Sequence, residues 1–217
     1  MNSIYSWLTF LPLAMSPAMA QSQITPGPFG GEHPPQGTSR LHVTLAPEDV
    51  PNSLMQLCDM SSLIVEGTVK SSLLPRQLSP SNLETDAIIS VTRLLKGTTP
   101  NPDIAVSQRG GTLGKFTISP TQFAIMQPGE KYLLFLKDDN RPNIPLVSGA
   151  KRYFVTGFWS GLFFLNAGKM QVNADSPDAL RKTYEGLSEE QLLSKVTDAL
   201  NHKGTPQPPF PLTTNQK

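Results

Sequence analysis

Residues 108–115, QRGGTLGK, combine cations and glycines in a pattern that can serve anion binding. Glycine-rich loops bind phosphate groups when a helix follows them, because backbone N–H groups at the helix start then point at the anion. The residues that follow, FTISP at 116–120, have no helical pattern. A bulged hairpin or strand-end loop is therefore expected here, with Arg109 and Lys115 beside a ligand groove.

Carboxylates could supply acid–base chemistry in the same part of the chain. The four candidates are Glu66, Glu84, Asp86 and Asp103. Nothing in the sequence forces any two of them together, and carboxylates at strand ends are usually solvated. Asp138 and Asp139 precede NRPN at 140–143, which is compatible with a calcium or magnesium loop. The spaced acids of an EF-hand are missing, and Asp and Asn are common turn residues, so an ordinary turn is expected.

Histidine and cysteine chemistry is limited by number and position. The three histidines, His33, His42 and His202, all lie outside the strand region, and no two have helix or strand spacing. Neither a zinc site nor a Ser-His-Asp or Cys-His centre is expected, so we predict no catalytic residue, metal or cofactor. Cys58 is the one cysteine, which excludes an intramolecular disulfide. We expect a buried, inert thiol; an intermolecular disulfide is the alternative.

Charge and aromatic residues indicate the kind of ligand. Residues 63–173 hold 12 Lys and Arg against 7 Asp and Glu, an excess of +5, although the whole chain carries +1. The near-neutral total argues against a dedicated nucleic-acid-binding or membrane-surface protein. Aromatic residues cluster in the same region: Tyr153, Phe154, Phe158, Trp159, Phe163 and Phe164. Aromatics that alternate in strands usually form the core, but barrels that bind polymers also use aromatic platforms beside basic grooves. Phe158 and Trp159 therefore join the two cations as candidate ligand-binding residues.

Residues 1–20, MNSIYSWLTFLPLAMSPAMA, have the pattern of a secretory signal peptide. The apolar stretch at 4–15 is shorter than the roughly 20 residues of a membrane-spanning helix. It is followed by Ala18-Met19-Ala20, a cleavage pattern with small residues at the required positions. We expect export to the periplasm or the cell exterior, cleavage before Gln21 and no transmembrane anchor; a retained signal is the alternative.

Composition divides the rest of the chain. Proline makes up 21 of 217 residues and only 16% are charged, which favours β-structure and loops. Pro and Gly dominate residues 21–50 and 204–217, which we predict to be a flexible arm and a disordered tail. Residues 51–203 are predicted to form a single β-barrel domain with C-terminal helices.

Seven strands are predicted from apolar runs rich in β-branched residues, at 63–71, 85–95, 104–108, 131–137, 152–156, 161–166 and 169–173. Residues 131–137, KYLLFLK, are apolar on both faces, as expected for a strand covered on both sides. A short N-terminal helix is predicted at 54–61. Two C-terminal helices are predicted, one capped by Ser176 with Pro177 at its first position, and one after the capping box SEEQ at 188–191. No helical crossover separates the strands, so we expect a small antiparallel barrel.

Three signatures resemble the strand pattern of netrin-like modules: LIVEGTV at 63–69, ISVTRLLKG at 89–97 and GEKYLLFL at 129–136. This family includes the tissue inhibitors of metalloproteinases, and a group of uncharacterised exported bacterial proteins is similar too. The resemblance covers about residues 54–173 and implies an OB-fold-like barrel. The inhibitors chelate the zinc of their target through an N-terminal cysteine fixed by a disulfide. Here the expected N-terminus is Gln21 and no second cysteine exists, so that activity is not carried over.

These observations predict a mainly β, OB-like exported protein that binds a protein or an anionic polymer of the cell envelope without catalysis. Nucleic acid is not expected as a ligand outside the cell. Two alternatives remain open. One is a carboxylate- or metal-dependent envelope hydrolase acting on glycans, whose signature would be two carboxylates about 5–9 Å apart in a cleft. The other is a structural envelope component.

Overall fold

The computed structural model describes residues 50–79, 82–118, 125–141, 144, 149–174 and 176–201. The predicted signal peptide, the N-terminal arm up to residue 49, the C-terminal tail and all three histidines lie outside these ranges. Within them, no helix has both the length and the apolar character needed to cross a membrane.

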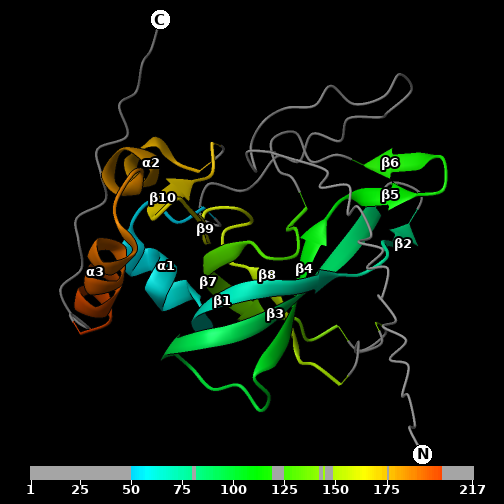
Figure 1. Ribbon diagram of the computed structural model, residues 1–217, viewed down its shortest axis with the longest axis horizontal. Helices are drawn as coiled ribbons and strands as arrows, with labels where there is room; N and C mark the ends of the chain where they lie inside the picture. The colour runs from blue at the N-terminus through cyan, green and yellow to red at the C-terminus, as the bar shows by residue number, and fades with distance from the viewer. Residues whose placement is uncertain are drawn as a thin grey trace, which may run out of the picture.

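Ten strands and three helices form in the described chain (Figure 1). In order they are α1 (Leu54–Met60), β1 (Leu63–Ser72), β2 (Arg76–Ser79), β3 (Asn82–Lys96), β4 (Asp103–Arg109), β5 (Gly111–Leu113), β6 (Phe116–Ile118), β7 (Lys131–Asp138), β8 (Arg152–Val155), β9 (Leu162–Asn166), β10 (Lys169–Val172), α2 (Asp178–Tyr184) and α3 (Glu189–Asn201). All seven predicted strands are present, as β1, β3, β4 and β7 to β10. The unpredicted strands β2, β5 and β6 have only three or four residues each, too few for an apolar pattern to show.

Five strands close into a barrel. β1 pairs with β3 and β7, β3 pairs with β4, β4 with β8, and β8 with β7, which completes the ring. The prediction of a purely antiparallel barrel is wrong, because β4 and β8 run parallel, with Ala105 opposite Arg152. A closed ring with an odd number of strands cannot reverse direction at every step. Five strands therefore require at least one parallel pair.

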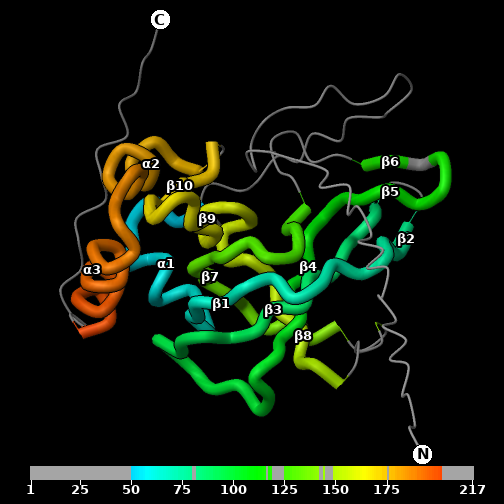
Figure 2. Tube along the Cα trace, viewed as in Figure 1, coloured from blue at the N-terminus to red at the C-terminus, as the bar shows by residue number. Residues whose placement is uncertain are grey.

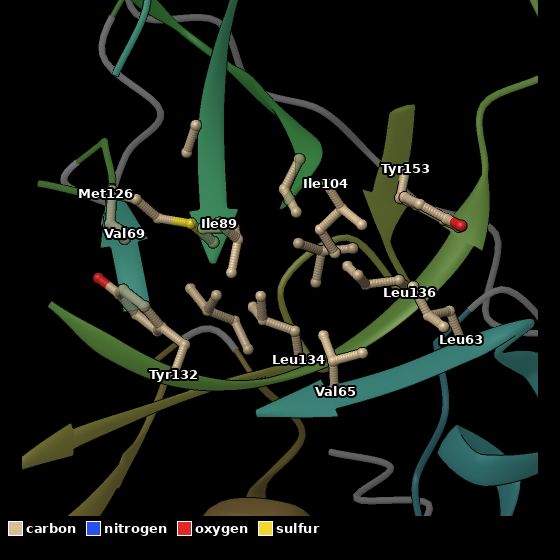
Figure 3. Close-up of a cluster of buried hydrophobic side chains, with 14 of the residues drawn as sticks. Leu63, Val65, Val69, Ile89, Ile104, Met126, Tyr132, Leu134, Leu136 and Tyr153 are labelled. Atoms are coloured by element: carbon tan, nitrogen blue, oxygen red, sulfur yellow. The ribbon is translucent and has the colours of Figure 1, made fainter. Parts of the chain in front are cut away.

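Two hydrophobic cores follow from the alternation of side chains along β7. Tyr132, Leu134 and Leu136 point into the barrel, where they join apolar residues of β1, β3, β4 and β8 (Figure 3). Leu133 and Phe135 point outward and pack with apolar residues of β9, β10 and all three helices. The prediction that this strand is covered on both faces is confirmed.

Local signals begin the helices. The Ser53 side chain accepts a hydrogen bond from a first-turn N–H of α1, and Ser188 and Gln191 form the predicted capping box of α3. The predicted cap of α2 is wrong. Pro177, with an extended ψ of 139°, occupies the N-cap in place of Ser176, and no side chain caps the helix. Figure 2 shows the three helices together on one side of the molecule, with the β5–β6 hairpin at the opposite end.

Candidate functional site

Polar side chains cover the outward face of β2, β3, β4 and β8. Residues directly opposite one another on paired strands share a face. The register gives two rows on this face, with Arg76, Glu84 and Arg109 in the first and Asp86, Ser107 and Phe154 in the second. The alternate residues of β3 and β4, such as Ala87, Ile89 and Val106, fill the barrel core. The apolar pattern of the interior therefore fixes the outward direction of the polar rows.

Asp86 is the centre of an ion-pair network on this face. Its carboxylate is fully buried and accepts hydrogen bonds from Arg76 Nη2 (2.9 Å) and Arg152 Nε (3.1 Å). Arg152 is only 2% exposed, whereas Arg76, on the short strand β2, reaches the surface. One buried carboxylate is thus enclosed by two guanidinium groups from elements far apart in the sequence.

Glu84 links two connections that flank the face. Its Oε2 accepts hydrogen bonds from Arg76 Nη2 (3.0 Å) and Arg141 Nη2 (2.8 Å), and Arg141 follows β7. Arg141 also donates to both carboxylate oxygens of Asp139, at 2.9 and 2.8 Å. Its guanidinium carbon lies 4.3 Å from the ring centroid of Phe154, within range of a cation–π contact. The connection between β1 and β3 is therefore tied to the connection between β7 and β8.

Arginine partners lower the pKa values of two carboxylates in this network. Burial alone would raise the pKa of Asp86, but hydrogen bonds and charge from Arg76, with the charge of Arg152, outweigh it and lower the pKa. The pKa of Asp139 is lowered in the same way, against burial, by Arg141. Three carboxylates face three guanidinium groups, so the ion-pair network is neutral as a whole. Its members are Arg76, Glu84, Asp86, Asp139, Arg141 and Arg152.

Asp86 and Asp139 are not suited to act as general acids. A general acid needs a carboxyl group whose pKa is raised toward the working pH, and the pKa values of Asp86 and Asp139 are lowered. No group of three or more His, Cys, Asp or Glu side chains able to hold a metal ion occurs within the described residues. The expectation that Glu84 and Asp86 are solvated is wrong, because arginines from distant segments pair with both. Glu66 is buried too and pairs with Lys131.

Two cations on this face lie outside the ion-pair network. Arg109 ends β4 opposite Glu84, and Lys137 lies on β7 opposite Phe154. Neither forms an ion pair with a carboxylate of the described ranges, whereas every guanidinium of the network does. Because the network is neutral, Arg109 and Lys137 carry the excess positive charge of the face.

The four residues predicted to bind a ligand lie in two places. Arg109 is at the end of β4, and Lys115 is exposed in the turn of the β5–β6 hairpin, where the glycine-rich segment forms the predicted hairpin. Phe158 and Trp159 lie in the turn between β8 and β9. Phe158 is 38% exposed with a φ of +60°, and Trp159 packs against the barrel core. The two pairs therefore come from different connections of the barrel.

Sequence reasoning missed the arginines of the network, Arg76, Arg141 and Arg152. One signal was present, since Glu84 and Asp86 are two positions apart in an otherwise apolar strand and so share a face. Carboxylates on a covered face require cations as partners. Which cations pair with them depends on the course of the connections, which the sequence pattern does not give.

The chain has no match among protein-family models, and no curated protein matches it. Its function is therefore argued from the site and not from relatives. The site consists of the neutral ion-pair network, the stacked Arg141 and Phe154, and the two cations beside them.

Proposed function

We propose that the chain is an exported, non-catalytic module with an OB-like barrel that binds an anionic polymer of the cell envelope on the outward face of β3 and β4. The strand order supports the OB-like barrel. The five ring strands, β1, β3, β4, β7 and β8, can be numbered 1 to 5 in chain order. Around the ring they then follow the order 1-2-3-5-4, which is the Greek-key order of an OB fold. The three netrin-like signatures fall on β1, β3 and β7 of this ring.

The position of the charged face supports polymer binding. OB folds bind oligonucleotides and oligosaccharides on the face of their second and third strands and on two flanking connections. In this ring those strands are β3 and β4, and the flanking connections supply Arg76 and Arg141. The single observation that carries the proposal is that Arg109 and Lys137, without ion-pair partners in the described chain, flank a neutral and internally bonded network.

Export supports an acidic glycan over a nucleic acid as the polymer. The proposal of export rests on the signal-like pattern of residues 1–20. Export is tested by N-terminal sequencing of the protein recovered from the exported fraction of an expression host, and Gln21 is the expected first residue. A protein that stays in the cytoplasm with Met1 in place would reject export.

Binding to immobilised polymers tests the proposed face. Polygalacturonate and dextran sulfate supply carboxylate and sulfate groups, and dextran is the neutral control. We expect binding to both acidic polymers and release by salt, because exposed charges are screened at high ionic strength. Arg109→Glu and Lys137→Glu should each weaken binding about fivefold or more, since one charge contact in water contributes about 1 kcal/mol. Lys169→Glu, an exposed lysine on β10, is the matched control and should bind as wild type.

Two results would overturn the proposal. If both charge reversals bind like the Lys169 control, the ligand does not lie on this face. If the folded wild-type protein retains no acidic polymer at low salt, the ligand is not an anionic polymer, and the alternative of a protein ligand takes its place.

A further inference from the structure

The end of the molecule that carries β2 and the β5–β6 hairpin lies opposite the helices (Figure 1). Two leucines are exposed in the segments that form this end. Leu74, in the connection between β1 and β2, is 89% exposed, and Leu113, at the end of β5, is 41% exposed. The other large exposed hydrophobic residues of the described chain are Leu94 and Phe158. Two of these four exposed hydrophobic residues therefore lie at the end of the molecule opposite the helices.

Leu74 is held outward by its neighbours. Leu73 packs against apolar residues of β3 and β4, and its N–H donates to the carbonyl oxygen of Asp86 (2.9 Å). Pro75 lies against Gly111, since a Cβ on that glycine would come within 2.5 Å of the proline ring. The side chain between these two packed residues projects from a fixed backbone.

The hairpin is fixed in the same way. Two hydrogen bonds between Gly110 and β3, each 2.7 Å long, hold its base. Gly111 and Leu113 are two positions apart on β5, so Leu113 shares the face that Pro75 contacts. Leu74, Pro75 and Leu113 therefore come from two segments that meet where Pro75 lies against Gly111, and we call these three residues the apolar tip.

The unpaired charges near the apolar tip are positive. Arg109, at the end of β4, and Lys115, in the hairpin turn, have no ion-pair partner within the described residues, whereas Arg76 of β2 is neutralised by Glu84 and Asp86. Lys115 is exposed in the turn of the hairpin. The whole-chain charge of +1 does not show this local excess. A near-neutral total charge is therefore compatible with attraction of this end to an anionic surface.

We propose that the apolar tip docks on the surface of an anionic lipid bilayer. Apolar side chains that project from two fixed loops can enter the interfacial region of any bilayer, whereas a protein partner would need a pocket shaped for each of them. Basic residues beside them add attraction to anionic headgroups. This docking goes beyond the polymer-binding face, because it requires neither Lys137 nor the ion-pair network.

Vesicle flotation tests the docking. The protein is purified from the exported fraction of an expression host and mixed with vesicles of phosphatidylcholine and phosphatidylglycerol, or of phosphatidylcholine alone. We expect flotation with the anionic vesicles and much less with the neutral ones. Leu74→Ser should lower partitioning about tenfold, as expected for one leucine that leaves the interface. Lys115→Gln should lower it about fivefold, because one basic residue near an anionic surface contributes about 1 kcal/mol.

Matched controls separate docking from folding and from polymer binding. Leu94→Ser replaces a leucine of similar exposure to Leu113 on the far part of β3 and should float as wild type. Lys137→Glu should weaken polymer binding but keep flotation. The proposal is overturned if wild type does not float with anionic vesicles, or if Leu74→Ser floats like the Leu94→Ser control. Self-association that Leu74→Ser abolishes, without flotation, would instead assign the tip to a protein contact.

Discussion

Replacing Asp86 with Asn tests the ion-pair network directly. The substitution keeps the shape of the side chain and removes its charge, and the new amide NH₂ faces guanidinium donors. Arg152, 2% exposed, then loses the nearer of its two carboxylate partners and keeps Asp139 at 3.8 Å. Removing one partner of a buried ion pair typically costs about 3–5 kcal/mol, because the remaining charge stays buried and uncompensated. We expect a loss near the lower end, about 3 kcal/mol, since Arg76 is partly solvated.

Urea unfolding followed by circular dichroism measures this loss. In a chain of this size, about 3 kcal/mol corresponds to a fall in melting temperature of roughly 6–12 °C. Asp178→Asn is the matched control, because Asp178 pairs with Arg181 on the exposed surface of α2 and should leave stability unchanged within error. A loss below about 1 kcal/mol in the Asp86 variant would refute the view that buried charge pairing holds this face together.

Three further perturbations probe other features. The pKa values of Asp86 and Asp139 are lowered in the folded state, so their contribution to stability is present above the ordinary carboxyl pKa and lost as pH falls through the folded values. The free energy of unfolding should therefore stay level down to about pH 5 and fall below about pH 4 in urea titrations; a level profile to lower pH would contradict this. Burial raises the pKa of the Cys58 thiol to about 11. Iodoacetamide at neutral pH should therefore modify Cys58 only after the protein is unfolded in urea. Rapid labelling of the folded protein would show that the thiol is accessible and would contradict this prediction. In Gly67→Ala the new methyl group would lie 2.5 Å from Ile89 Cγ2. Thermal melts should therefore show a decrease in the free energy of unfolding of about 1–3 kcal/mol. An unchanged melting temperature would reject the close contact between β1 and β3.

Strand positions could be predicted because they depend on short-range patterns. The alternation in residues 85–95 places Ala87, Ile89 and Val91 on one face. In the structure Ala87 and Ile89 belong to the barrel core and Val91 packs against it. Where the pattern was shorter than about four residues, as in β5 and β6, no strand could be predicted.

The pairing of the strands could not be predicted in the same way. Alternation shows which side chains share a face, but it does not show which strand lies beside which. β9 and β10 have the same sequence pattern as the barrel strands, yet they pair outside the ring. The parallel pairing of β4 and β8 follows from the closure of a five-stranded ring. The sequence pattern did not show how many strands close the ring, so this pairing could not be inferred.

The total charge of the barrel region could be read from the sequence, but the position of the excess could not. Ion pairs do not change the net charge of the region, but they determine which residues keep an uncompensated charge. The arginines Arg76, Arg141 and Arg152, which a charge count treats as ligand-binding groups, are neutralised by buried carboxylates. Arg109, Lys115 and Lys137 have no ion-pair partner in the described chain, and they lie at β4, at the hairpin turn and on β7. Part of the excess positive charge therefore lies on β4, on β7 and in the hairpin turn, where it can act on an acidic polymer and on an anionic surface.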